Sequence, residues 1–401
     1  MNPTFYSWLT GGLVGADWLA LLLVFAVVAH LTILSVTLYL HRCQAHRGVD
    51  LHPLVSHPMR FWLWLTTAMV TKEWVAIHRK HHAHCETPED PHSPVHYGIA
   101  KVAFQGVELY QRASDDASIM AQYGAGTPDD WIERRVYSPL SALGPTLLLF
   151  LYVALFGVLG VTVWALQMLV IPVLAAGMIN GIGHWWGYRN FETDDRATNI
   201  VPWGVISGGE ELHNNHHAFP SSARFAMRRF EFDLGWSVLV GLEKLHLAKV
   251  RRVAPKLDIR ANIAMPDSDT LRAVMVHRYQ VMRDYFRTVV LPTLGGEASH
   301  AGNALRELPR RLRRALRDQG HWLDQANRER LHAWIAQRPR VATVYEYRQR
   351  LRAIYERSGQ SSEAMLEALR LWCREAEASG NRALQDFAMR LKGYQLAPAR
   401  A

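Results

Sequence analysis

Long apolar runs separated by polar segments dominate the first half of the chain. Residues 18–40 are apolar apart from one histidine and a few hydroxyl side chains, and as a helix they are long enough to cross a bilayer. No Asp, Glu, Lys or Arg occurs between Arg135 and Arg189, so we expect two further spans, over 140–160 and 161–184. A soluble helical hairpin would need a polar face, which this stretch lacks.

A second apolar region, residues 53–77, is interrupted by Arg60, Lys72 and Glu73. We therefore expect it to form helices that lie at the membrane interface or dip into it, rather than a full span. Tryptophan rings favour that depth, and the predicted anchors are Trp62, Trp64 and Trp74.

Charge is divided unevenly along the chain. Residues 1–250 carry a net charge of −3 and residues 251–401 a net charge of +12. No Lys or Arg precedes Arg42, so every basic residue follows the first predicted span, and the positive n-region of a signal peptide is missing. The positive-inside rule then predicts an integral protein of the inner (cytoplasmic) membrane, with its N-terminus outside and residues from 41 onward at the cytoplasmic face.

The three cysteines, Cys43, Cys85 and Cys373, are odd in number and show no C-x-x-C spacing. A disulfide framework is therefore not expected, and a reducing compartment fits this composition. We interpret all three as ordinary thiols, although Cys43 and Cys85 lie next to histidine clusters.

Short histidine clusters follow the predicted spans. An H-x-x-H-H pattern occurs at residues 78–82 and again at 213–217, and a third cluster places His41 and His46 five residues apart. Helical residues three and four apart share a face, so each H-x-x-H-H is predicted to aim three rings at one point. His41 and His46 would be about 140° apart on an ideal helix and converge only where the chain turns.

One further pair ends the last predicted span. Asn180 and His184 are four residues apart and are expected to share a helix face. A lone histidine is usually an ordinary surface or core residue, but nine imidazoles on one membrane face favour a site for two metal ions. Imidazole-rich sites suit zinc, iron, copper or nickel, and a redox role would select iron. Nearby carboxylates that are candidates to bind the outer ring nitrogens are Glu73, Asp90, Asp194, Asp195, Glu210 and Glu211.

These motifs resemble the integral-membrane fatty acid desaturases, specifically the Δ9 acyl-chain group that includes the stearoyl-CoA desaturases. The resemblance covers about residues 30–220 and rests on HRCQAHR (41–47), KEWVAIHRKHH (72–82), EDPHSP (89–94), NGIGHWWGYRN (180–190) and GGEELHNNHHAFP (208–220). It implies an all-α integral membrane fold, with a few transmembrane helices and interfacial helices under a cytosolic helical cap that carries a histidine-box dimetal site. One departure is that a single clear span precedes the first cluster, where the stearoyl-CoA relatives have two.

The resemblance also implies the chemistry. The implied cofactor is a di-iron centre of two Fe ions, although other metals can occupy such a site in overexpressed protein. The position of Asn180 reaches one metal through water, so Asn180 is the implied catalytic residue. The implied metal ligands are His41, His46, His78, His81, His82, His184, His213, His216 and His217. An oxidoreductase of this kind uses paired donors, with O2 reduced to water, to place a cis double bond, here predicted at Δ9, in a saturated acyl chain.

The reaction needs partners that the chain does not contain. No P-loop, no strand-borne G-x-G-x-x-G and no haem-binding His-Pro-Gly-Gly occurs, so a separate electron-donor protein is expected. The acyl carrier stays open among an acyl lipid, acyl-CoA and acyl-ACP. The aromatic residues that either line an acyl tunnel or anchor at the membrane interface are Trp185, Trp186, Tyr188 and Trp203.

A basic helical region, residues 256–401, follows the predicted membrane desaturase domain of residues 1–255. Leucines recur at helical spacing among arginines over 304–317, and residues 345–395 are predicted to pack as a small helical bundle. The arginine-rich face fits anionic lipid headgroups, the solvated face of an ordinary helical domain, or nucleic acid. We favour lipid and expect no nucleic-acid partner.

Two alternatives to a desaturase stay open. A di-iron membrane hydroxylase of the same histidine-box superfamily shares the metals and differs after hydrogen abstraction. A non-catalytic metal-binding membrane protein would share the clusters but not the reaction. The sequence separates the hydroxylase from the desaturase only through the family resemblance.

Overall fold

A computed structural model describes residues 3–298, 308–309, 312–313, 315–316, 323–356 and 360–397. The chain forms two compact units. Unit 1 comprises Met1–Arg189 and Asp195–Ala254, and unit 2 comprises Asn190–Asp194 and Pro255–Ala401. A short piece of the first half of the chain therefore belongs to the C-terminal unit.

Helices make up most of both units. The described elements of unit 1 are α1 (Pro3–Gly11), α2 (Trp18–Ser35), η1 (Val36–Ala45), β1 (Val49–Leu51), α3 (Pro53–Thr67), α4 (Thr71–His84), α5 (Pro94–Tyr97), α6 (Ile99–Phe104), α7 (Gly106–Ser114), α8 (Ala117–Tyr123), η2 (Glu133–Tyr137), α9 (Leu143–Phe156), α10 (Val158–Pro172), η3 (Val173–Gly181), η4 (Ile182–His184), β2 (Trp203–Gly204), α11 (His213–Ala218), β3 (Phe232–Asp233), α12 (Leu234–Lys244) and β4 (Ala248–Val250). Those of unit 2 are β5 (Leu257–Ile259), α13 (Ser268–Val276), α14 (Arg278–Tyr285), η5 (Phe286–Val290), α15 (Leu291–Ala298), α17 (Gln325–Ala336), α18 (Pro339–Glu356), α19 (Ser362–Ala378), α20 (Arg382–Lys392) and β6 (Tyr394–Leu396).

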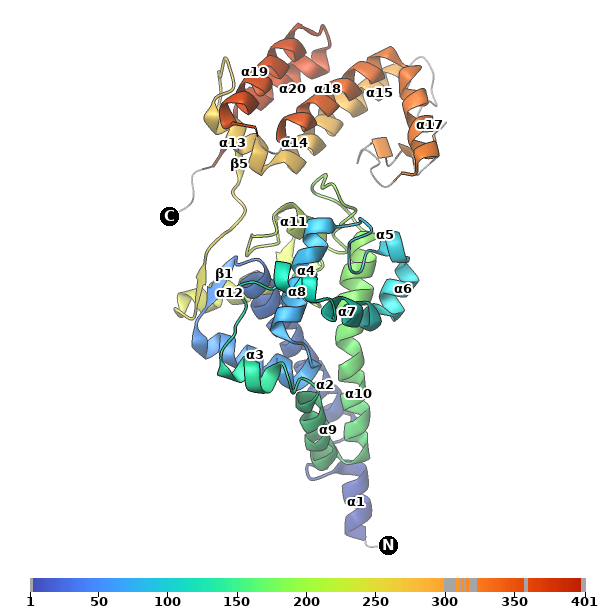
Figure 1. Ribbon diagram of the computed structural model, residues 1–401, viewed down its shortest axis with the longest axis vertical. Coiled ribbons are helices and arrows are strands. Elements are labelled where there is room, and N and C mark those ends of the chain that lie inside the picture. The colour runs from blue at the N-terminus through green and yellow to red at the C-terminus, as the bar shows by residue number, and fades with distance from the viewer. Residues whose placement is uncertain are drawn as a thin grey trace. The chain divides into compact units, whose positions relative to one another are not determined.

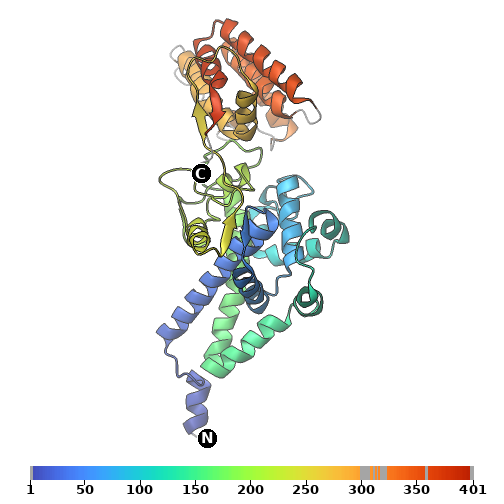
Figure 2. The ribbon, with the colours of Figure 1, turned by 90° about the vertical axis from the view of Figure 1, so that its left-hand side faces the viewer.

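Apolar helices form a stalk, made of α2, α9 and α10, in unit 1 (Figure 1 and Figure 2). Two continuous helices, Trp18–Ala45 and Val158–His184, are long and apolar enough to cross a membrane. Together with the desaturase-like histidine clusters described below, they define an all-α membrane fold.

The second predicted span is shorter than expected. Its helix, α9, runs only from Leu143 to Phe156, and the chain turns at Gly157. Gly157 has φ +64°, and a Cβ there would stand 2.5 Å from the carbonyl oxygens of Trp8 and Leu9. Only glycine fits this turn, because both the backbone conformation and the close approach of α1 exclude a side chain.

The predicted interfacial region, residues 53–77, forms α3 and the first half of α4, with a break at Ala68 (φ +60°). Two of its predicted anchors are instead engaged inside the protein. Trp64 is buried and donates its indole N–H to the Leu140 carbonyl at 3.0 Å, and the Trp74 ring stacks on His78. Among the described residues, α3 and α4 do not belong to the helices that are long and apolar enough to cross a membrane. Contacts within the protein engage these two tryptophan rings.

The described residues also form three two-stranded sheets. In unit 1, β1 and β4 are antiparallel with Val49 opposite Val250, and β2 and β3 are parallel. In unit 2, β5 and β6 are antiparallel with Leu257 opposite Leu396. Strand β1 follows η1 in the chain, and β4 lies near the end of unit 1. Their pairing therefore places the helix that carries His41 next to a later part of the chain.

The helices of unit 2 enclose a hydrophobic core that includes Tyr285, Leu351, Trp372 and Phe387. Helices α18, α19 and α20 cover the region predicted as a bundle. Most of the predicted arginine-rich helix at 304–317 lies outside the described residues. The described leucines of that segment, Leu308, Leu312 and Leu316, are buried in this core.

Candidate metal centre

The nine predicted histidines come together in unit 1 as two neighbouring groups. The first group comprises His41, His46, His78, His82 and His216, whose ligand atoms all lie within 4.8 Å of one another. We call it the five-histidine cluster.

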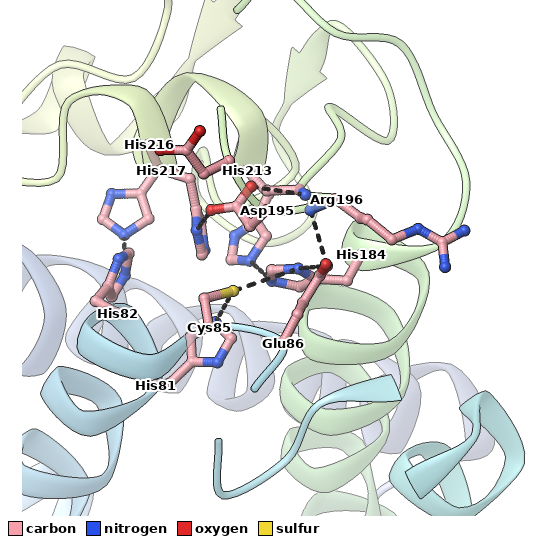
Figure 3. A network of polar contacts seen from close by, with 12 residues as sticks. His81, His82, Cys85, Glu86, His184, Asp195, Arg196, His213, His216 and His217 are labelled. Atoms are coloured by element: carbon pink, nitrogen blue, oxygen red, sulfur yellow. Dashed lines mark hydrogen bonds and ion pairs between the residues drawn. The ribbon is translucent and has the colours of Figure 1, made fainter. Parts of the chain in front are cut away.

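The second group contains His81, His184 and His217, together with Cys85. His213 adjoins it, because its Nε2 lies 3.0 Å from Nε2 of His184 (Figure 3). We call these residues the second cluster. The two groups together contain all nine predicted imidazoles.

The three rings of each H-x-x-H-H motif do not point to one place, contrary to the expectation from the sequence. On α4, His78 and His82 face the five-histidine cluster, while His81 faces the second cluster. On α11 the division is reversed: His216 joins the first cluster, and His213 and His217 join the second. Residues four apart stay together because they lie nearly above one another on a helix, and the remaining histidine is rotated toward the other group.

A π-helix brings His41 and His46 together. The end of the first long helix, η1, has i→i+5 hydrogen bonds, and the N–H of His46 donates to the carbonyl of His41 at 3.1 Å. The two rings are consequently 4.9 Å apart between centroids. The extra residue per turn converts a spacing that diverges on an α-helix into one that converges, and such π segments are frequent at functional sites.

The Asn180–His184 pair also departs from the expected geometry. Asn180 lies in the π-helix η3, and the chain tightens to a 3₁₀ turn, η4, before it reaches His184. The two side chains therefore do not share an α-helical face. His184 is fully buried in the second cluster, whereas Asn180 lines a cavity that also reaches His41, His78 and His213.

Three of the candidate carboxylates hold outer ring nitrogens. Glu210 lies 2.7 Å from Nδ1 of His41, Asp90 lies 3.0 Å from Nδ1 of His81, and Asp195 lies 2.7 Å from Nδ1 of His217. Such contacts fix the tautomer so that the other nitrogen presents its lone pair.

The remaining candidate carboxylates have other partners. Glu73 interacts with the Tyr110 hydroxyl, and Glu211 accepts backbone N–H groups of Ser207 and Gly209. Asp194 forms an ion pair with Arg352 in unit 2.

Sequence reasoning missed Cys85 in the second cluster and Glu86 beside it. Glu86 lies 3.3 Å from Nδ1 of His184 and accepts the backbone N–H of Arg196 (Figure 3). It sits at φ +63°, a conformation that a non-glycine residue adopts only when its surroundings require it. The Cys85 thiol lies 3.9 Å from nitrogens of both His81 and His184. Its spacing of four from His81 was the available signal for Cys85; no comparable signal existed for Glu86.

Burial keeps most of these imidazoles neutral. It lowers the pKa of five of them well below the ordinary value of 6.5, and neighbouring rings lower it further; these are His46, His78, His82, His213 and His216. Burial also lowers the pKa of His217, to about 4, against the opposing effect of Asp195. His81 differs, because the Asp90 carboxylate outweighs burial and raises its pKa. Neutral rings offer the lone pairs that a metal ion needs.

The donor geometry fits two metal ions. Nε2 of His216 lies 3.0 Å from Nε2 of His41 and 2.9 Å from Nε2 of His82. Nitrogens bound to one metal at about 2.1 Å and at right angles would be about 3.0 Å apart. In the second cluster, Nε2 of His217 is buried and has no hydrogen-bond partner among the described residues. A metal ion would satisfy this nitrogen.

A cavity of about 530 Å³ adjoins the clusters. It begins at His41, His78 and His213 and continues along Met168 and Ile171 of α10. The volume lies in the range of small-molecule sites. Three tryptophans considered as tunnel walls, Trp185, Trp186 and Trp203, do not line it and are 46 %, 64 % and 66 % exposed. Trp74 lines it instead.

Comparison with known proteins identifies the family. A family model described as "Fatty acid desaturase" matches residues 16–234, more than half of the chain, and the chain therefore belongs to the fatty acid desaturase family. It is 30% identical over 254 residues to "Probable lipid desaturase ADS3.2, chloroplastic" of Arabidopsis thaliana, covering 62% of this chain and 65% of that protein. It is 30% identical over 271 residues to "Icosanoyl-CoA 5-desaturase" of Limnanthes douglasii, covering 66% of this chain and 72% of that protein. It is 28% identical over 219 residues to "Delta-9 acyl-lipid desaturase 2" of Arabidopsis thaliana, covering 54% and 69%.

Unit 2 has a separate similarity. A family model described as "Transposase" matches residues 271–397, less than a third of the chain. The described secondary-structure elements of this segment are helices, apart from the short strand β6. The match is confined to unit 2, and the expectation of no nucleic-acid partner stays a prediction.

Proposed function

We propose that the protein is an O2-dependent acyl-chain desaturase that introduces a cis double bond, at Δ9, into a saturated acyl chain. The observation that carries the proposal is the cavity, which connects the histidine clusters with an apolar passage along α10. An acyl chain in this passage would place one methylene pair beside the clusters. An unactivated methylene has no acidic proton, so side-chain acid–base chemistry alone cannot desaturate it.

Two iron ions are the cofactor that we propose for the clusters, with the nine histidines as ligands. They would supply the oxygen chemistry that removes the hydrogens. Asn180 lines the cavity, and we propose that its amide holds a water molecule beside the clusters. Glu210, Asp90 and Asp195 keep the rings of His41, His81 and His217 oriented.

The walls of the cavity supply the other requirements of the reaction. Met168, Ile171 and Ile179 line the cavity with apolar side chains, which would exclude water from a bound acyl chain. A separate electron-donor protein provides the two electrons. The substrate that we propose is an acyl lipid, acyl-CoA or acyl-ACP, since the relatives include proteins named as an acyl-lipid desaturase and as an acyl-CoA desaturase. The charge distribution supports an N-terminus outside and clusters at the cytoplasmic face.

Expression in a host that lacks its own desaturase tests this proposal. Lipid analysis that separates lipid classes, chain positions and double-bond locations should show new cis-unsaturated chains, concentrated in the class that carries the substrate. Accumulation of hydroxylated chains without an alkene would favour the hydroxylase of the same superfamily. An unchanged lipid profile, with the protein present in the membrane, would favour a non-catalytic metal-binding protein.

A further inference from the structure

The two clusters, which both lie in unit 1, hold different sets of donors. The five-histidine cluster offers five imidazoles, whereas the second cluster offers four, from His81, His184, His213 and His217. The thiol of Cys85 brings the second cluster to five donors as well, because its sulfur and the ligand atoms of His81, His184 and His217 all lie within 4.8 Å of one another. The second cluster therefore combines nitrogen with sulfur, a softer donor that is common in iron and zinc sites.

The thiol lies beside the nitrogen of His81 that faces the cluster. Nδ1 of His81 contacts the Asp90 carboxylate, which leaves Nε2 as the ligand atom, and Sγ of Cys85 lies 3.9 Å from this Nε2. A sulfur and a nitrogen held by one ion at about 2.3 Å and about 2.1 Å would be about 3.1 Å apart at a right angle and about 3.8 Å apart at 120°. Sγ also lies 3.9 Å from Nδ1 of His184, so the thiol stands between two rings of the cluster (Figure 3). A small rotation of the Cys85 side chain would thus bring its sulfur to coordination distance.

The backbone at Cys85 is held by the same carboxylate that orients His81. Helix α4 ends at His84, and Cys85 is its C-cap residue. One residue later, Glu86 adopts a left-handed φ of +63°, and its N–H donates to the Asp90 carboxylate at 2.8 Å. Asp90 thus fixes both the ring of His81 and the peptide that follows Cys85. The position of the thiol is therefore set by the turn that builds the metal site.

A nitrogen of His217 independently indicates that an ion belongs in this cluster. His217 is 7 % exposed, and its Nε2 is buried without a hydrogen-bond partner among the described residues, while its Nδ1 contacts Asp195 at 2.7 Å. A buried polar atom of this kind is costly unless a ligand satisfies it. Three carboxylates beside the cluster, those of Glu86, Asp90 and Asp195, would offset the positive charge of the ion.

We propose that the Cys85 thiolate is the fifth protein ligand of the second metal ion, in addition to the nine histidines. The S–H bond of the thiol breaks and an iron–sulfur bond forms, with the proton released to solvent and no change in oxidation state. This assignment rests on the proposed function only in that the clusters hold two iron ions. It replaces the interpretation of Cys85 as an ordinary thiol, and it gives the two ions different donors.

The test uses the full-length protein, purified and loaded with iron, and iron K-edge X-ray absorption spectra of the first coordination shell. We expect a sulfur neighbour at about 2.3 Å, the thiolate distance in zinc sites, at about one sulfur per two irons. Cys85→Ser should lose this sulfur signal. It should also release one of its two irons at a chelator concentration about 10-fold lower or less, since a lost ligand weakens binding at least as much as a lost outer partner.

Cys43→Ser is the matched control. Cys43 also neighbours a histidine motif, but it packs against the apolar group that includes Leu38 and Val49 rather than joining a histidine cluster. The double variant Cys43→Ser/Cys373→Ala leaves Cys85 as the only cysteine of the chain. Both variants should keep the sulfur signal and the iron retention of the wild type.

Different results separate this inference from the proposed function. Iron neighbours of nitrogen and oxygen only, in the wild-type protein, would overturn the assignment and give the fifth position to a water molecule such as the one proposed at Asn180. A sulfur signal that survives in Cys85→Ser would overturn it as well. If Cys85→Ser fails to fold, the double variant decides, because Cys85 supplies its only thiolate.

The yield of alkene from the same iron-loaded samples tests the proposed function separately. A wild-type protein that shows the iron–sulfur signal yet forms no alkene would contradict the desaturase proposal and leave the ligand assignment intact. A wild-type chain that retains fewer than two irons would overturn both.

Discussion

His41 and Glu210 are joined by a buried contact between residues 169 positions apart in the chain, with Nδ1 of the ring 2.7 Å from Oε1 of the carboxylate. Thr37, one turn before His41, donates its hydroxyl to the same oxygen. Because the ring N–H donates to the carboxylate, Nε2 carries the lone pair, and it points to His216 at 3.0 Å. The contact thus sets both the tautomer and the direction of a proposed ligand.

Replacing this carboxylate should weaken the metal in the five-histidine cluster. Glu210→Gln keeps the shape of the side chain but removes the negative charge that makes the His41 imidazole a stronger metal ligand. The affinity of the five-histidine cluster for iron should therefore fall about 10-fold or more. Chelator titration followed by metal analysis measures the effect. Glu243→Gln is the control, because Glu243 is exposed and its carboxylate accepts the backbone N–H of Val250 rather than contacting a histidine of the clusters. Equal iron retention in both variants would argue against the orienting role of Glu210.

Two histidines on one helix distinguish the metal site from a general requirement for α4. His81 belongs to the second cluster, whereas His84, three residues later, pairs with Glu89 and Tyr123. His81→Ala should lower the yield of unsaturated chains in a desaturase-deficient host by more than about 100-fold, since it removes a ligand and not merely an outer partner. His84→Ala should leave the yield within about twofold. A His81→Ala protein with wild-type activity would show that the proposed site is wrong.

A glycine leaves room for His213. A Cβ at Gly183 would stand 3.2 Å from Cδ2 of His213, closer than the ring tolerates without moving. We expect Gly183→Ala to displace His213 and lower occupancy of the second cluster, visible as less iron per chain. At Gly177, earlier in the same long helix, a Cβ would meet its nearest neighbours at 3.9 Å, an ordinary contact. Gly177→Ala should therefore retain the wild-type iron content.

The sequence predicted which histidines cluster better than it predicted the directions of their rings. Spacing on a helix is local, so the nine histidines and the long apolar helices could be located from sequence. The division of each H-x-x-H-H between two clusters depends on how α4 and α11 face each other. The spacing of residues within one helix carries no information about this orientation. The π-helical turn at His41 and His46 is likewise selected by its surroundings, because isolated chains favour the α-helix.

The carboxylates show the same limit. Glu210 and Asp90 adjoin histidine motifs in sequence and were natural candidates, but Glu211 and Glu73 adjoin them equally and have other partners. Glu86 was missed because its role follows from a left-handed backbone conformation and from the return of the chain at Arg196. Long-range packing, rather than residue type, decides which acid meets which ring.

The cavity along α10 predicts a dependence on chain length. Ile171 lines it, whereas Leu169 on the same helix is exposed on the apolar stalk. Ile171→Trp fills part of the passage, so desaturation of the longest saturated chains should fall at least about 10-fold more than that of shorter ones. Leu169→Trp adds the same bulk outside the cavity and should keep the wild-type preference. Competition among saturated chains of graded length measures the ratio, and an unaltered ratio in Ile171→Trp would place the acyl chain elsewhere.

His277 should make unit 2 sensitive to acid. Burial lowers its pKa from 6.5 to about 4, so between these values the unfolded chain binds a proton that the folded unit does not. Its contribution to stability is complete above about pH 6.5 and is lost as the pH falls toward 4, amounting to roughly 2 kcal/mol between about pH 7 and about pH 5. Hydrogen–deuterium exchange of α13 and α14 across this range measures it. His277→Gln should reduce this pH dependence of stability. His332→Gln, at an exposed position, should leave it unchanged.

The central claim is that this chain desaturates an acyl chain at a di-iron centre, and the product of a reconstituted reaction tests it most directly. Purified protein loaded with iron would be supplied with a reductase and ferredoxin-type donor, O2 and saturated acyl substrates on each carrier, and the products analysed by mass spectrometry. We predict a cis alkene on one carrier class, formed only when O2, electrons and about two irons per chain are present. A hydroxylated chain without an alkene, or turnover that is indifferent to iron, would contradict the account.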